Sequence, residues 1–343
     1  MSNATDATSP STGRRKTALQ LLKWLLFLVV LVFIAKRAWL LWQQGDFSSV
    51  KLRLEWLLPA GLAYALGWLP SVWFWHSMMS ALGKAPSWKT AARAYYVGHL
   101  GKYVPGKAMV LVIRAGMVRK DEVPLSVGAL TATYETLFLM AVALVLAVAL
   151  SPLFLRPEQW NALPEWTSWF HTHVWTIPVL ALLATVSALP LVSQVFSIVA
   201  RKMTPAELSE GSTDVRRIPT STLFGGLLAF TIAWTLHGLS LALTLRSLGV
   251  GWNWRLWPVC IAAVSLATSI GFLAVFAPGG LGVREGLLIE TLKGTVGGPQ
   301  AILASVMLRL LWFLTELLLA ALLYLLLKSS ETSQTDSLKN ELP

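Results

Sequence analysis

Long apolar runs, separated by short polar stretches, dominate the chain. An α-helix of about 20 apolar residues crosses the roughly 30 Å hydrocarbon core of a bilayer. The pattern predicts about seven spanning helices, at residues 18–36, 56–82, 126–150, 175–199, 220–246, 258–277 and 301–327. The polar stretches hold at most about 20 residues, too few for a folded soluble domain. We therefore expect an all-α polytopic membrane domain at 18–327, with a disordered leader at 1–17 and a polar tail at 328–343.

Composition supports this class and limits the partners. Hydrophobic residues make up 55% of the chain and charged residues 13%, which is typical of a membrane protein. The net charge of +11 suits anionic lipid headgroups. No basic and aromatic module outside the apolar runs is long enough to bind nucleic acid. We expect membrane lipids as partners and no nucleic acid; the oligomeric state is left open.

The distribution of basic residues predicts the orientation. With the N-terminus in the cytoplasm, the inner segments hold 15 Lys and Arg residues and the outer segments hold 6, as basic loops favour the cytoplasmic side. Ten of the 17 tryptophans flank the three outer loops, where interfacial aromatic residues are enriched. The leader at 1–17 is therefore placed in the cytoplasm.

The segment 87–120 differs from the spanning helices. Arg93, Tyr96, His99 and Tyr103 recur at helical spacing, and the helix is expected to break at Pro105-Gly106. The apolar run that follows, 108–113, is too short to span. Lys107 and Arg114 bracket it. The segment is either an amphipathic helix on the inner surface or a re-entrant hairpin, which needs a cavity to satisfy its backbone.

The stretch FAPGGLGVREG, residues 276–286, repeats this device. Pro278 lies 173 positions after Pro105, close to half the length of the chain. Matching interruptions in two halves are typical of transporters built from repeats, with the binding site at the breaks. The repetition favours re-entrant segments at about 87–120 and 278–297 in two loosely repeated halves, although an ordinary turn also favours Pro and Gly. Whether 283–297 crosses or re-enters decides the side of the C-terminus, and the sequence leaves both open.

Three charges lie inside predicted spanning helices, and each needs a partner. They are Glu135, Arg309 and Glu316. A charge at a helix centre costs roughly 2.5–3.5 kcal/mol on insertion scales. The candidate partners are Glu285 or Glu135 for Arg309, and Arg284 or Arg114 for Glu316. The charges either serve function or form an ion-pair network that fixes the packing of the helices.

Two blocks carry a resemblance to a known family. The block PGGLGVREG, together with GHLGKYVPGK and Arg114 upstream, resembles the flippase-like family named for the lysylphosphatidylglycerol synthase transmembrane region, over about residues 20–327. The resemblance implies a multi-pass inner-membrane protein that moves an amphiphilic lipid between leaflets. It also implies a two-part site, formed by Pro105, Gly106, Lys107 and Arg114 and by Pro278, Gly279, Gly280, Gly282, Arg284 and Glu285. Many members carry an acidic residue shortly after the first Pro-Gly, where this chain has Lys107-Ala108-Met109.

The residue types suit an anionic headgroup. Glycines permit positive φ and close approach, and a helix that begins near Leu281 points free N–H groups at an anion. Arg284 can bind a phosphate in bidentate fashion, and Glu285 either orients Arg284 or receives a cationic headgroup. His99, Lys102 and Tyr103 are possible further members of the site.

An enzyme is the alternative class. The sequence contains no nucleophile motif and no phosphate-binding loop. The group of His171, His173 and Glu165 is a poor metal site. We expect no metal, no cofactor and no catalysis by this chain alone. An enzymatic role requires a separate lipid-modifying transferase, aminoacyl or glycosyl, for which the chain is the membrane subunit; a purely structural subunit ranks last.

Overall fold

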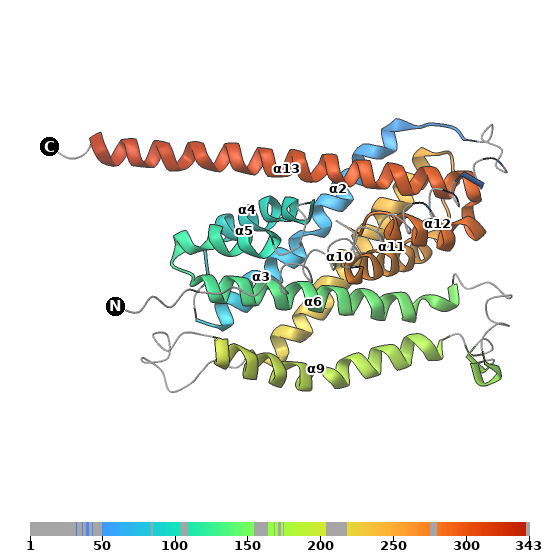
Figure 1. Cartoon of the computed structure of the whole chain (residues 1–343), viewed down its shortest axis with the longest axis horizontal. Helices are drawn as coiled ribbons and strands as arrows, with labels where there is room; N and C mark the ends of the chain where they lie inside the picture. The colour runs from blue at the N-terminus through green and yellow to red at the C-terminus, as the bar shows by residue number, and fades with distance from the viewer. Residues whose placement is uncertain are drawn as a thin grey trace, which may run out of the picture.

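The computed structural model has helices and no strand in the residues that it describes (Figure 1). These are residues 50–340 without 84, 104–108, 154–163, 168, 171–172, 174, 204–217 and 275–279, together with positions 32, 36, 39, 40 and 43. The predicted leader and most of the predicted first spanning helix, 18–36, lie outside this part of the chain. The predicted all-helical class is confirmed.

Six of the predicted spanning helices are confirmed within a few residues. Helices long and apolar enough to cross a membrane occupy Leu54–Ala81, Leu125–Ala149, Thr176–Val199, Thr220–Ser247, Leu256–Leu273 and Gly298–Leu323. Four of them are α6 (Leu125–Ala149), α9 (Thr176–Met203), α10 (Thr220–Ser247) and α11 (Leu256–Leu273), and the last is the first part of α13 (Gly298–Asn340). The backbone of the predicted polar tail continues α13 to Asn340.

The first of these spans is bent. It consists of η2 (Leu54–Trp56), α2 (Leu57–Gly67) and α3 (Leu69–Ala81). Pro70 stands in the first turn of α3, where its missing N–H leaves a carbonyl of α2 without its usual helical partner. The bend separates the two helices at Trp68.

Two short helices form a hairpin after α3. They are α4 (Trp88–His99), extended by η3 (Leu100–Tyr103), and α5 (Met109–Val118). A Cβ on Gly98 would lie 2.6 Å from the Arg114 side chain, and one on Gly101 would lie 2.6 Å from the Val110 nitrogen, so these glycines allow the two arms to pack closely. Helices of 12 and 10 residues extend about 18 and 15 Å, too short to span.

A second hairpin joins α11 to α12 (Val283–Val296). A Cβ on Gly280 would lie 3.0 to 3.1 Å from the Gly271 backbone, and Gly280 and Gly282 have φ of +70° and +85°. Close packing and positive φ both require glycine here. Gly282 is the N-cap, so α12 begins at Val283, two residues after the predicted start near Leu281.

The hairpins belong to two halves of similar order. The first half consists of α2–α3, the α4–α5 hairpin and α6, and the second of α10, the α11–α12 hairpin and α13. In Figure 1 the α4–α5 hairpin extends inward from the left end and the α11–α12 hairpin from the right end. Within the bundle, α12 runs back toward the end at which α11 begins, and α13 runs toward the end at which α3 meets α4 (Figure 1). Whether 283–297 crosses the membrane or re-enters stays open.

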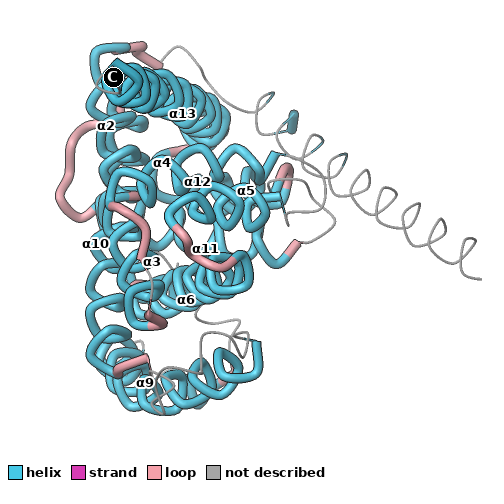
Figure 2. Tube along the Cα trace, turned by 90° about the vertical axis from the view of Figure 1, so that its left-hand side faces the viewer, coloured by secondary structure: helices cyan, strands magenta, loops and turns pink. Residues whose placement is uncertain are grey.

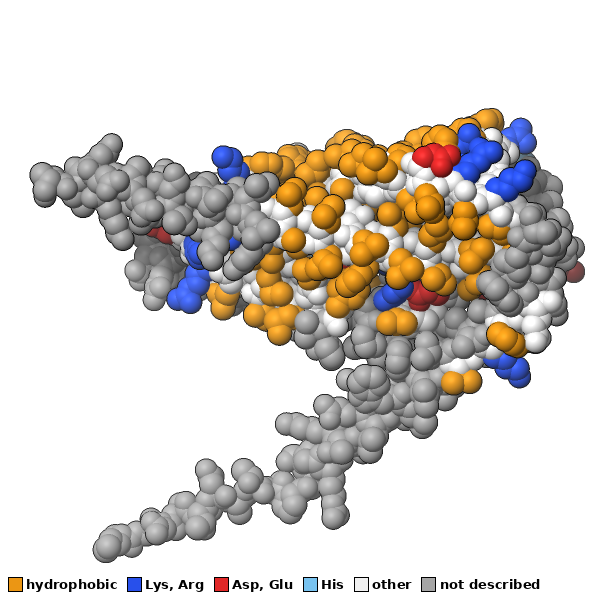
Figure 3. Space-filling model, turned by 90° about the horizontal axis from the view of Figure 1, so that it is seen from above, with side chains coloured by type: hydrophobic (Ala, Val, Ile, Leu, Met, Phe, Trp, Pro, Cys, Tyr) orange, Lys and Arg blue, Asp and Glu red, His pale blue; other side chains and the backbone are white. Residues whose placement is uncertain are grey.

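The remaining long helix, α9, lies at the edge of the bundle. Figure 2 shows α9 and α13 at opposite edges with the other helices between them. On the face in Figure 3, hydrophobic side chains cover the middle, and Lys and Arg gather mainly toward the two ends. This distribution is expected for a protein with its middle in hydrocarbon and its ends in water.

Candidate functional site

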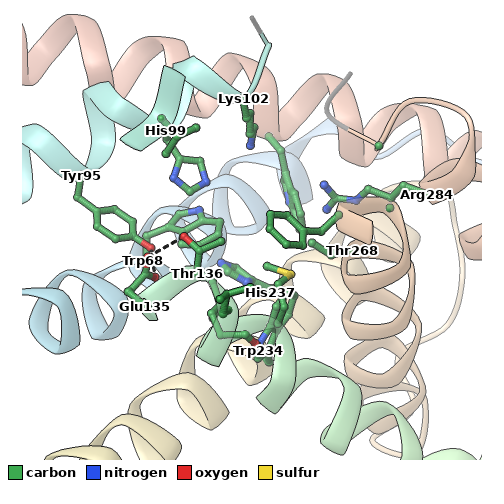
Figure 4. A pocket seen from close by; sticks show the side chains of 18 of the residues that line it. Trp68, Tyr95, His99, Lys102, Glu135, Thr136, Trp234, His237, Thr268 and Arg284 are labelled. Carbon is green, nitrogen blue, oxygen red and sulfur yellow. Dashed lines mark hydrogen bonds between the residues drawn. The ribbon is translucent and has the colours of Figure 1, made fainter. Parts of the chain in front are cut away.

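A cavity of about 440 Å³ lies where the two hairpins approach each other. Its lining comes from α2, α4, η3, α5, α6, α10, α11, α12 and α13. Figure 4 shows Lys102 and Arg284 from opposite hairpins on its rim. The lining includes Leu137 and Leu273, which are 50% and 62% exposed on the outer apolar face. The cavity therefore reaches the lipid-facing side of the protein between α6 and the end of α11.

The deepest ion pair joins the first hairpin to α6. The Arg114 guanidinium donates to the Glu135 carboxylate at 2.8 Å, and both side chains are at most 2% exposed. The Tyr95 hydroxyl donates to the same carboxylate at 2.8 Å, and the Arg114 guanidinium lies 3.7 Å from the centre of the Tyr95 ring. A buried charge pair needs such further hydrogen bonds to offset its lost hydration.

His99 lies beside this pair, with its Nδ1 3.3 Å from an Arg114 nitrogen. In the tautomer that has no proton on Nδ1, the ring accepts a hydrogen bond from the guanidinium.

The second ion pair joins the tip of the first hairpin to α13. Lys102 pairs with Glu316, whose side chain is 2% exposed. Tyr103 donates to the same carboxylate at 3.0 Å, and Tyr64 donates to it from α2. The predicted partners of Glu316, Arg284 and Arg114, are therefore wrong. The η3 turn brings Lys102 to α13, whereas Arg114 already pairs with Glu135.

The third ion pair lies at the start of α12. Arg309 on α13 pairs with Glu285, which confirms one of the two partners proposed for Arg309. The other oxygen of Glu285 accepts from the Gly282 N–H at 2.6 Å, as the N3 residue of a capping box. Glu285 thus holds α12 against α13. It neither orients Arg284 nor faces the cavity as a free receptor for a cation.

Arg284 is a cation of the cavity that takes part in none of these three ion pairs. Its guanidinium lies 4.4 Å from the centre of the Trp312 ring, and among the described residues it has no ion pair or hydrogen bond. Lys102 and Arg114, the other cations of the lining, are each neutralised by a carboxylate. Among the described residues of its lining, the cavity therefore has one arginine or lysine side chain without an ion-pair partner.

The ion pairs also relate the two halves. Arg114–Glu135 joins the first hairpin to the following long helix, and Glu285–Arg309 does the same in the second half with the charges reversed. The corresponding positions are 171 and 174 residues apart, close to the 173 that separate Pro105 from Pro278. Opposite charges therefore lie at nearly matching positions of the two halves.

The aromatic wall of the cavity was not predicted. His237 lies 4.6 Å from Trp68, ring centre to ring centre, and Trp68 lies 4.1 Å from His99. In the described part of the chain, Trp68 Nε1, His237 Nε2 and Thr268 Oγ1 are buried without a hydrogen-bond partner. His237 is isolated in sequence, but it lies 173 positions after Tyr64, whose ring centre is 5.3 Å away. That offset is the signal by which it could have been found.

The remaining predicted site residues divide into two groups. Gly280 lines the cavity and Gly282 caps α12. Pro105, Gly106, Lys107, Pro278 and Gly279 lie outside the described residues, so the breaks are located here only by the helices on either side of them. The site that the structure assembles consists of Arg284 with the ion pairs and aromatic rings around it.

The fold and the site together define a multi-pass α-helical membrane protein with a largely apolar cavity among its helices, into which a few charged residues are set. Residues 20–320 match the family model of the lysylphosphatidylglycerol synthase TM region, and the chain belongs to this family. Membership connects the protein with the chemistry of membrane lipids. No curated protein matches the chain.

Proposed function

We propose that the protein is a lipid transporter of the inner membrane, with its N-terminus in the cytoplasm, that moves an anionic lipid between leaflets. The observation that carries this proposal is Arg284, which has no ion-pair partner among the described residues and lines a cavity that reaches the apolar outer face. A headgroup can enter the cavity while its acyl chains remain in the bilayer.

The positive charge of Arg284 favours a lipid with a negatively charged headgroup. A phosphodiester carries one negative charge, which matches the single positive charge of Arg284. Arginine binds phosphate oxygens with two parallel N–H donors. Trp312 holds the guanidinium by its ring face, which leaves the N–H edge available to a ligand.

The hairpins supply the path. We propose that both are re-entrant and that their tips meet near the middle of the membrane. Because one hairpin extends from each end of the bundle, movement of either against the long helices opens the cavity toward one side. Transporters built from inverted repeats alternate access in this way.

Lipid movement in proteoliposomes tests the proposal. Purified protein is reconstituted with an acyl-labelled fluorescent phosphatidylglycerol, and a membrane-impermeant reductant reports the fraction that has reached the outer leaflet. We expect wild type to accelerate exchange over protein-free vesicles, and Arg284→Gln to lower the rate by about 10- to 100-fold, because a charge-assisted hydrogen bond to phosphate is lost.

Arg255→Gln is the matched control. Arg255 also lies over a tryptophan ring, 5.5 Å from the centre of Trp254, but it is exposed on the loop before α11. It should retain the wild-type rate. An unchanged rate in Arg284→Gln would contradict the proposed site. Absence of movement by wild type, with and without a proton gradient, would favour the alternative role as membrane subunit of a lipid-modifying transferase.

A further inference from the structure

Three polar atoms around the cavity lack partners within the described part of the chain. They are the indole Nε1 of Trp68, Nε2 of His237 and the hydroxyl of Thr268, and each is fully buried. A fourth such atom of the lining, Nε of Arg114, belongs to the guanidinium that already pairs with Glu135. His237 is 1% exposed and Trp68 7%. Figure 4 shows these three side chains beside the space toward which Arg284 points. Buried polar atoms are nearly always hydrogen-bonded, so their shared location indicates a ligand with several polar groups.

The types of these atoms define what they can bind. The Trp68 indole only donates, the Thr268 hydroxyl donates and accepts, and a neutral His237 does one or the other at Nε2. A hydroxyl group can satisfy all three, because it both donates and accepts.

An amine headgroup fits less well. An ammonium group only donates, and a buried one needs a carboxylate. The carboxylates at the cavity are already engaged, Glu135 by Arg114 and Glu316 by Lys102. Glu285 pairs with Arg309 and caps α12. The described residues therefore offer no carboxylate to a cationic head.

We propose that the cavity selects a lipid whose head combines one phosphodiester with a neutral polyol, such as glycerol, inositol or a sugar. Arg284 binds the phosphate, and Trp68, His237 and Thr268 bind the hydroxyls. This specificity rests on the proposed transport function and adds the class of cargo to it.

Binding to the purified full-length protein in detergent tests the specificity, with quenching of tryptophan fluorescence as the readout. Phosphatidylglycerol is compared with phosphatidylmethanol, which has the same charge and the same acyl chains but no hydroxyl group, and with phosphatidylethanolamine. We expect phosphatidylglycerol to bind about tenfold more tightly than phosphatidylmethanol, and phosphatidylethanolamine to bind most weakly.

Thr268→Val tests whether the Thr268 hydroxyl contacts the lipid head, because valine removes the hydroxyl and keeps the shape of the side chain. It should weaken phosphatidylglycerol binding about two- to tenfold and leave phosphatidylmethanol binding unchanged. Thr185→Val on α9, whose hydroxyl bonds its own helix at Ala181, should change neither. Equal affinity of wild type for the two anionic lipids would overturn the polyol specificity and leave the transport proposal standing. Failure of every anionic lipid to bind would overturn both.

Discussion

The Glu135 carboxylate lies under a cluster of donors. Arg114 bonds it from α5, Tyr95 from α4, and Thr136 from the next position at 3.3 Å. Both charges of the pair are buried, so each depends on the other for a low energy in the folded state. The pair joins the first hairpin to α6. Its contribution to the stability of the fold does not depend on any role in binding.

Removal of one partner should therefore cost more than removal of both. We predict that Arg114→Met lowers the free energy of unfolding in detergent by about 3–5 kcal/mol, because Glu135 is left buried and unpaired. The double variant Arg114→Met with Glu135→Met should recover most of this loss. Lys293→Met, which breaks the pair between Lys293 and the more exposed Glu290, is the control and should change stability by less than about 1 kcal/mol. A double variant as unstable as the single one would contradict this account.

At the residue scale, the sequence predicted correctly which charges need partners, because this follows from the free-energy cost of an unpaired charge in the membrane. Because an intramembrane charge is expensive, Glu135, Arg309 and Glu316 were expected to have partners, and each has one. The identity of a partner depends on the three-dimensional packing. Arg284 or Arg114 was expected to pair with Glu316, and the structure gives Lys102 instead. The η3 turn that brings Lys102 to α13 has no simple sequence signal.

At the scale of elements, the glycines of the second hairpin set how closely α11 and α12 approach. Gly271 and Gly280 pack backbone to backbone, and the positive φ of Gly280 and Gly282 turns the chain into α12. Arg284 and Glu285 occupy the first turn of that helix, so the turn determines where both charges lie. A change in the turn should disturb the site even though no charged group is altered.

Gly280→Ala tests this dependence. The added methyl group would meet the Gly271 backbone at 3.0 to 3.1 Å, at a φ of +70°. We predict a loss of about 1–3 kcal/mol in unfolding free energy and slower lipid movement. Gly116→Ala is the control: on α5 it has nothing within 4 Å of the new Cβ, and alanine favours a helix, so stability should be unchanged or slightly higher. Equal stability of the two variants would show that the close approach is unimportant.

The positions of the hairpins could be predicted from the sequence, but their packing could not. Proline and glycine indicated the breaks at 105–106 and 278–279, and the helices on either side end close to those positions. The two helices of the first hairpin are short, and their sequence pattern is amphipathic. Helices on the membrane surface and helices of a hairpin can both have this pattern. Tyr95 and Arg114 are buried, and both bond Glu135 on α6. These contacts join residues far apart in sequence.

At the scale of the whole molecule, two similar halves place one hairpin at each end of the bundle. Hydropathy was sufficient for six of the spanning helices because membrane thickness fixes their length. It could not reveal the cavity, because Trp68, His237 and Thr268 come from three apolar stretches and show no periodic pattern. The cavity is formed only when these stretches pack together, and the proposed transport requires the headgroup to pass through it.

The most direct test of that route is to fill the cavity and measure lipid movement. Thr268→Trp places an indole in the cavity, and Leu228→Trp places the same group on the exposed face of α10. Thermal unfolding first verifies that both variants are folded. If the headgroup passes through this cavity, Thr268→Trp will reduce phosphatidylglycerol movement in proteoliposomes to the protein-free rate, and Leu228→Trp will retain the wild-type rate. A folded Thr268→Trp variant that moves the lipid as fast as wild type would contradict the account.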